Sequence, residues 1–186
     1  MRYFELITDP EVSNPIRLQK IDKQQYKNGL SEEEFQAVPE LKVAYFQNSP
    51  QVEILDVLEA PAFLVSDEVK RVFELYEPQM LFRALQVFSM DQEDKTAPLY
   101  WLPWIPKIEC LSRKSEKYDN GMLKKLVLNL DVPLEHEIFQ VAGLIEHKVI
   151  VSMAVAESML RRRQSGFRLV PVLFAKDEEK LLQSAD

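Results

Sequence analysis

Residues 66–76 read SDEVKRVFELY, and this stretch is the clearest secondary-structure signal in the sequence. Apolar side chains recur at three- and four-residue spacing from Val69 to Phe73, which is typical of one face of an amphipathic helix. Ser66 is a favoured N-cap residue, and Pro78 ends a helix soon after this stretch. We therefore predict a helix over 67–76.

Strand-like segments lie on both sides of this helix. Residues 80–90 are rich in Phe, Leu and Val, and residues 99–105 follow after a polar turn, so we predict a hairpin. Pro103 lies inside the returning strand. Because proline cannot donate to a ladder, we expect this strand at a sheet edge or with a bulge. Further strands are predicted at residues 1–7, 15–21, 41–46, 52–58, 123–130, 138–144, 149–151 and 167–174.

Two further helices are predicted. A short one follows Ser31, and a longer one over 153–164 has Ser152 as its cap and Gly166 as its left-handed C-terminal residue. Strands outnumber helices about three to one, and regular alternation of strand and helix is absent. We therefore predict an α+β fold with a largely antiparallel twisted sheet and two principal helices.

The length of 186 residues favours one domain, which we place at residues 1–176, with a charged and frayed tail at 177–186. The single cysteine, Cys110, is consistent with a reducing compartment. The sequence contains no apolar stretch of signal-peptide or membrane-spanning type. We expect a cytoplasmic protein without membrane association.

The formal net charge of −7 bears on the choice of partner. A phosphate backbone repels such a surface, so nucleic-acid binding is disfavoured. An acidic surface can attract a basic protein, although it can also serve solubility alone.

Sequence motifs for cofactors are missing. The four glycines (Gly29, Gly121, Gly143 and Gly166) are too far apart for a phosphate-binding loop or a nucleophile elbow. The segment His136–Gln140 reads HEIFQ and lacks the second histidine of the zinc-protease motif, and it has the character of loop and strand. We predict no catalytic residue, no metal site and no cofactor.

Two kinds of catalytic chemistry stay open as alternatives. Cys110 becomes a nucleophile if His136 or His147 lies beside it, but a core position is favoured. Carboxylates also cluster at Glu53, Asp56 and Glu59 and at Glu135 and Glu137, as they do by chance in a chain with thirty acids.

The most unusual local sequence is YWLPWIP at residues 100–106, which contains both tryptophans of the chain. On a strand, Trp101 and Trp104 point to opposite faces, so only one of them faces the core. The other either anchors a partner or lies under a loop or second sheet. Our candidate partner-binding residues are Tyr100, Trp101 and Trp104.

A series of segments follows in order between residues 61 and 174: Ala60–Ser66 leading into a helix, the following strand pair, Ser115 with Tyr118, Ile138–Val141, Val149–Ser152 and Gly166–Val172. In these segments the chain resembles a bacterial family of polymorphic-toxin immunity proteins, the immunity-protein-eleven family. Where that family has an asparagine after the aromatic strand and an acidic residue before a serine, this chain has Pro103 and Ser112. The resemblance implies a protein that neutralises a cognate toxin by binding and that has no catalytic residues.

The sequence therefore favours a non-enzymatic protein-binding domain, with a basic toxin encoded nearby as its expected partner. The alternative is a regulatory or small-ligand-binding domain, and an enzyme with a carboxylate site comes third. The sequence leaves the oligomeric state and the binding surface open.

Overall fold

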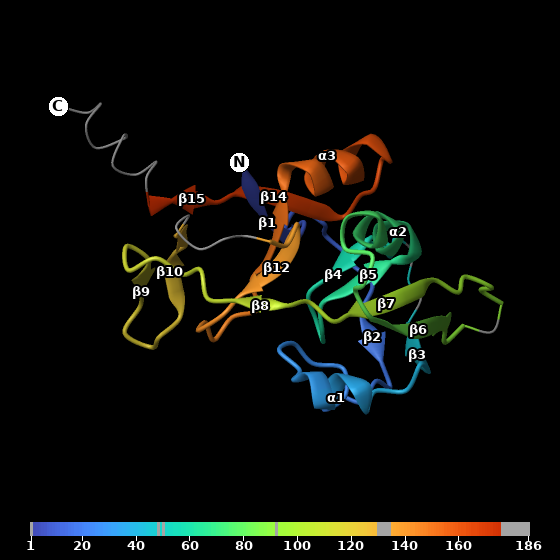
Figure 1. Cartoon of the computed structure of the whole chain (residues 1–186). Coiled ribbons are helices and arrows are strands. Elements are labelled where there is room, and N and C mark those ends of the chain that lie inside the picture. The colour runs from blue at the N-terminus through green and yellow to red at the C-terminus, as the bar shows by residue number, and fades with distance from the viewer. Residues whose placement is uncertain (1, 48, 50, 92, 130–134, 176–186) are drawn as a thin grey trace. The chain divides into compact units, whose positions relative to one another are not determined.

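The fold is described from a computed structural model (Figure 1), covering residues 2–47, 49, 51–91, 93–129 and 135–175. The chain divides into two compact units. The central unit comprises Ile7–Trp104 and Ser158–Arg168, and the terminal unit comprises Met1–Leu6, Ile105–Glu157 and Leu169–Asp186. A single domain over 1–176 stays a prediction, and the tail at 177–186 lies outside the described residues.

The central unit contains a six-stranded sheet. Its strands are β2 (Leu18–Gln19), β3 (Leu41–Phe46), β4 (Val57–Leu58), β5 (Leu64–Ser66), β6 (Phe82–Ser89) and β7 (Leu99–Pro103). They follow the order β2-β3-β6-β7-β5-β4, and the pairs are antiparallel except β3 with β6, which is parallel. The strands predicted at 15–21 and 52–58 are each reduced to two residues, β2 and β4.

Helix α2 (Asp67–Tyr76) forms as the sequence predicts. Its N-cap is Ser66, whose side chain accepts a hydrogen bond from the Val69 amide. Val69, Val72 and Phe73 are buried, and the helix packs on β5 and β7. The helix therefore covers the part of the sheet that these two strands form.

The hairpin of β6 and β7 is confirmed, but the prediction of an edge or bulged strand for β7 is wrong. β7 lies inside the sheet, between β6 and β5. Pro103 is its last residue and pairs with Phe82 on β6, whereas β5 pairs only with Tyr100 and Trp101. The strand accommodates the proline because its neighbour β5 ends before that position.

The opposite face of the sheet packs against the short helix α1 (Glu32–Gln36). Ser31 and Glu34 form a capping box, in which each side chain accepts a hydrogen bond from the other's main-chain amide. Phe35 is the buried residue of this helix. It belongs to a core cluster that includes Ala44, Phe46, Leu85, Val87, Tyr100 and Leu102.

The terminal unit contains most of a second, five-stranded sheet. Its strands are β1 (Tyr3–Thr8), β8 (Lys107–Ile108), β12 (Ile138–Val141), β13 (Val149–Ser152) and β14 (Phe167–Pro171), in the order β14-β1-β13-β12-β8. Tyr3 packs edge-to-face on Phe139 and Phe174, with ring centroids 5.7 and 5.9 Å apart, so aromatic contacts hold the core of this unit.

Two small strand pairs complete the terminal unit. They are β9 (Glu116–Lys117) with β10 (Leu123–Lys125), and β11 (Val127–Leu128) with β15 (Leu173–Phe174). The strand predicted at 123–130 is therefore broken in two, and β9 precedes it as a short strand that the sequence did not predict.

Helix α3 (Met153–Arg161) begins after Ser152, whose hydroxyl accepts a hydrogen bond from the Val155 amide, as predicted. It ends three residues earlier than the predicted 164. Arg163, with a φ of 57°, is the left-handed residue nearest the helix end, so Gly166 is not the cap residue. Gly166 is also left-handed, with a φ of 75°, for another reason: a Cβ there would lie 2.7 Å from the side chain of Leu55.

The predicted fold class is confirmed: the chain is a strand-rich α+β protein with mostly antiparallel pairing and two longer helices, α2 and α3. None of the helices in the described part of the chain has the length and apolar character that a membrane span needs.

Candidate partner-binding surface

The three predicted partner-binding residues occupy different environments on or just after β7. Tyr100 is only 1% exposed, and its hydroxyl donates to the Leu55 carbonyl at 2.8 Å. Burial raises the pKa of this hydroxyl above its ordinary value. Trp104 is partly buried and packs against the core cluster on the α1 face. Tyr100 and Trp104 therefore anchor β7 to the hydrophobic core on the α1 face.

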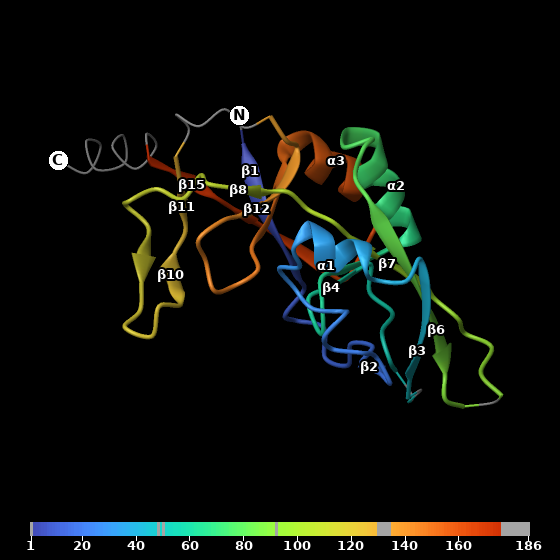
Figure 2. The same cartoon turned by 60° about the horizontal axis from the view of Figure 1, so that its bottom comes forward.

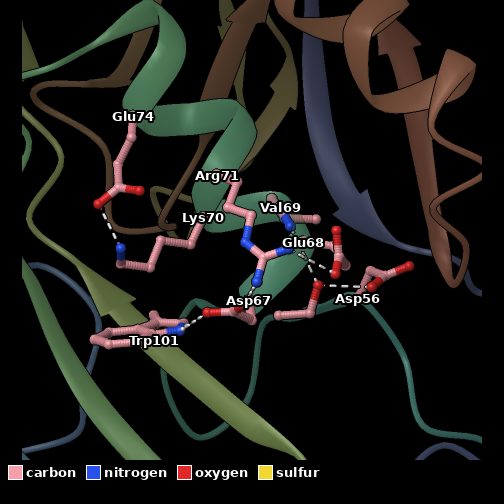
Figure 3. Close-up of polar contacts among 9 residues, drawn as sticks. Asp56, Asp67, Glu68, Val69, Lys70, Arg71, Glu74 and Trp101 are labelled. Atoms are coloured by element: carbon pink, nitrogen blue, oxygen red, sulfur yellow. Dashed lines mark hydrogen bonds and ion pairs between the residues drawn. The ribbon is translucent and has the colours of Figure 1, made fainter.

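Trp101 lies on the other face, beside α2 (Figure 3). Its Nε1 donates to Asp67 Oδ1 at 3.1 Å, and the Lys70 ammonium lies 4.6 Å from its ring centroid. The same ammonium is 5.1 Å from the Phe82 ring, which meets Trp101 edge-on. A cation beside two aromatic faces is attracted by both, so these contacts fix the Trp101 ring against the helix.

The first turn of α2 is also tied to a neighbouring loop (Figure 3). Ser66 Oγ donates to Asp56 Oδ1 at 2.6 Å while it accepts from the Val69 amide. The second oxygen of Asp56 accepts from the Ser165 amide at 2.6 Å. Asp56 therefore serves as a structural acceptor.

The exposed side of α2 bears ion pairs. Arg71 bridges Asp67 at 2.6 Å and Glu68 at 3.2 Å, and Lys70 pairs with Glu74. Arg71 is 64% exposed, so solvent screens its pairs, and such surface pairs contribute about 0–1 kcal/mol each. They set the charge pattern of this surface more than its stability.

Helix α2 leaves the other half of the same sheet face open. Because paired residues in neighbouring strands point to the same side, the register Leu41–Ala84–Trp101 runs across this face from β3 to β7. Leu41, Val43 and Phe88 are 60, 39 and 41% exposed. We call this surface the β3–β6 face and define it by Leu41, Val43, Tyr45, Gln86 and Phe88.

The β3–β6 face has large apolar side chains around one polar residue, Gln86, whose amide donates to the Ala97 carbonyl. The small, buried residue Ala84 separates this face from Trp101. Tyr45 lies within it and has the Lys20 ammonium 4.9 Å from its ring centroid. Contiguous exposed apolar groups of this kind mark contact sites more often than scattered ones do.

Cys110 and His147, considered above as catalytic candidates, lie in buried or partly buried environments. Cys110 is fully buried beside aromatic and aliphatic side chains, and burial raises the pKa of its thiol to about 11. At neutral pH it is a protonated core residue, as the sequence favoured. Burial, followed by the charge of Lys107, lowers the pKa of His147 to about 4.

The three carboxylates near residue 56 have separate surroundings. Glu59 accepts from the Thr8 amide at 2.7 Å, Asp56 accepts from Ser66 and Ser165, and Glu53 is exposed. The HEIFQ segment leads into β12, not into a helix, as expected. Across the described ranges no group of three His, Cys, Asp or Glu side chains could hold a metal ion.

The comparison with known protein families adds the deciding observation. The model of the immunity protein family (Imm11) matches residues 9–173. The chain belongs to this family. The resemblance predicted over 61–174 is confirmed, and the match begins well before it, so it includes β2, α1 and β3. No curated protein matches the sequence.

Membership of the immunity protein family gives the chain an immunity role in general terms. The apolar residues of the β3–β6 face were not among the predicted site residues. One signal was present in the sequence: LKVAYF at 41–46 has apolar side chains at alternate positions on both faces, which is typical of a strand that needs cover on both sides.

Proposed function

We propose that this chain is a non-enzymatic immunity protein that neutralises a cognate bacterial toxin by binding it directly in the cytoplasm. Family membership supports the role. The observation that supports the mode of action is the β3–β6 face, where Leu41, Val43 and Phe88 remain exposed beside α2, which covers β5 and β7 on the same side of the sheet. Burying these side chains in a complex releases their hydration water and favours association.

The proposed toxin domain is basic. The chain has a net charge of −7, and the loop after β6 adds Asp91, Glu93 and Asp94 at the end of the β3–β6 face where Phe88 lies. Hydrogen bonds from Thr96 hold the pKa of Asp94 below its ordinary value, which keeps it ionised at neutral pH. Such a charge distribution steers a cationic protein towards the apolar face.

The predicted aromatic residues have defined places in this proposal. Trp101 borders the β3–β6 face and offers its accessible edge to the toxin, whereas Tyr100 and Trp104 hold β7 against the core. Tryptophan at the margin of an apolar patch is a frequent contributor to binding energy.

A regulatory or small-ligand-binding domain is the second candidate. One observation favours it: a cavity of about 440 Å³ in the terminal unit, lined by Arg2, Glu137, Ser152, Met153, Ala154 and Glu157. That volume lies within the range of small-molecule sites. A small molecule that co-purifies with the protein and leaves on denaturation would favour this function.

The test of the immunity proposal is co-expression with the toxin domain encoded beside the gene. Cells that carry this toxin are expected to survive with the wild-type protein and to die with Phe88→Glu. This change should weaken the purified complex by about 30-fold or more, because a carboxylate replaces a ring that is buried on binding.

Ile145→Glu is the control for the charge change, since Ile145 is 72% exposed in the terminal unit and receives the same carboxylate in place of an apolar side chain. It should protect cells as the wild type does. Death of cells with the wild-type protein, together with no complex between purified components, would reject the proposal.

A further inference from the structure

Strand β3 has a partner strand along only part of its edge on the side away from β6. β2 joins it through the pairs Leu18–Phe46 and Gln19–Tyr45 and then ends. The next residue, Lys20, has a φ of 55°, a left-handed conformation that turns the chain away from β3. In the part of the chain that the structure describes, no strand pairs with residues 41–44 on this side (Figure 2).

The main-chain groups of Leu41 and Val43 point to this open edge. In a parallel pair, alternate residues of a strand direct both N–H and C=O to the same neighbour. The carbonyls of Glu40 and Phe46 accept hydrogen bonds of 2.8 Å from the β6 side, so the even-numbered residues face β6. The odd-numbered residues therefore face outward, and β2 uses only Tyr45 among them.

An extended main chain is the natural partner of such an edge, because it supplies donors and acceptors at the same spacing. The side chains of Leu41 and Val43 project onto the apolar β3–β6 face, so alternate side chains of an added strand would lie beside them. Glu40 precedes β3 at the open edge, and Asp91 and Glu93 follow β6 at the far end of the β3–β6 face, where Lys20 lies over Tyr45. These carboxylates outnumber the one ammonium and favour a segment with cationic flanks.

We propose that an extended segment of the cognate toxin, apolar at alternate positions and flanked by Lys or Arg, adds as a strand to the open edge of β3. The inference rests on the proposed function and specifies how the toxin is held. The N–H and C=O groups of Leu41 and Val43 make the main-chain contacts, and the β3–β6 face receives the apolar side chains.

The variant Val43→Pro tests the main-chain contact. An outward-facing N–H on an edge strand tolerates proline, but the substitution removes the donor and blocks pairing. We expect the affinity for the purified toxin domain encoded by the neighbouring gene to fall about tenfold or more in titration calorimetry. Val43→Thr keeps the N–H and the β-branched shape but adds a hydroxyl to the apolar face, so its affinity should fall less than that of Val43→Pro.

A second measurement uses the wild-type protein and does not depend on the folding of a variant. Hydrogen exchange of the free and toxin-bound protein should show new protection at the amides of Leu41 and Val43, with the Ile145 amide unchanged as a control. Toxin binding without this protection, or with full affinity in Val43→Pro, overturns the strand-addition inference and leaves the immunity function standing.

Two other outcomes have different meanings. Absence of any complex with the wild-type protein overturns the proposed function and this inference together. A wild-type dimer in size-exclusion chromatography that Val43→Pro converts to a monomer assigns the open edge to a second copy of the chain, and so overturns the toxin as its occupant.

Discussion

At the scale of single residues, a glycine can be required for two reasons, a left-handed backbone or the lack of space for a side chain, and the sequence alone does not distinguish them. Gly166 and Gly143 have nearly the same positive φ, 75° and 76°, yet only Gly166 lies against another side chain. A Cβ at Gly166 would meet the Cβ and Cδ2 of Leu55 at 2.7 Å, whereas a Cβ at Gly143 has nothing within 4 Å. Substitution at Gly143 therefore costs backbone strain alone, and substitution at Gly166 adds a clash.

We expect Gly166→Val to lower the free energy of unfolding by about 2–4 kcal/mol, because it combines left-handed strain with overpacking. Gly143→Val should cost only about 1–2 kcal/mol. Urea denaturation of both variants measures the difference. Equal losses would mean that the Leu55 contact relaxes freely and that conformation alone requires glycine at position 166.

At the scale of elements, α2 depends on one hydroxyl with two partners. Ser66 Oγ caps the helix through the Val69 amide and donates to Asp56, whereas Ser31, which caps α1, accepts from the Glu34 amide within its own capping box. Loss of the Ser66 hydroxyl removes the cap and also takes a donor from a partly buried carboxylate.

Ser66→Ala should therefore destabilise the protein by about 2 kcal/mol, and Ser31→Ala by about 1 kcal/mol. Thermal denaturation followed by circular dichroism measures both. The role assigned to Asp56 is wrong if the two alanine variants melt alike.

Local signals explain which elements the sequence predicts well. The bounds of α2 follow from a cap, an apolar face and Pro78, all of which act within a few residues. Strand β2 is shorter than predicted because the left-handed Lys20 ends its pairing with β3 after two residues. Strand β4 is short because it pairs only with Leu64 and Val65 of the short strand β5. The interior position of β7 depends on β5, which is distant in sequence.

The candidate site is also harder to predict, because its exposure depends on elements that are distant in sequence. Both faces of LKVAYF at 41–46 bear apolar side chains, and nothing local tells which of them a helix covers. In the structure α1 packs on the side of Ala44 and Phe46, whereas α2 lies over β5 and β7 on the other side and leaves Leu41 and Val43 exposed. Family membership could be predicted because its segments recur in order along the chain, from residue 61 onward.

At the scale of the whole molecule, the proposed function gives net charge a role in the encounter with the partner. With a charge of −7, the chain would attract the proposed basic toxin at long range, and salt would screen this attraction over about 8–10 Å at 0.1–0.15 M. In the proposed complex, short-range apolar contacts would hold the two proteins together, and salt would affect them little.

The association rate constant should therefore fall as sodium chloride rises from about 0.05 to 0.5 M, while the dissociation rate constant changes less. Surface plasmon resonance with the purified toxin domain measures both. A salt effect confined to dissociation would contradict steering and point to ion pairs inside the interface.

The parallel pairing of β3 with β6 also has a consequence for the order of folding. Its register joins Leu41 to Ala84 and Phe46 to Ser89, positions 43 residues apart, whereas the β6–β7 hairpin joins Gln86 to Leu99 across 13. Closing the longer loop costs about 1 kcal/mol more entropy, and non-local pairs form late in folding. We therefore expect the hairpin and α2 to form before β3 pairs with β6, and β2, which joins the sheet through β3, to follow.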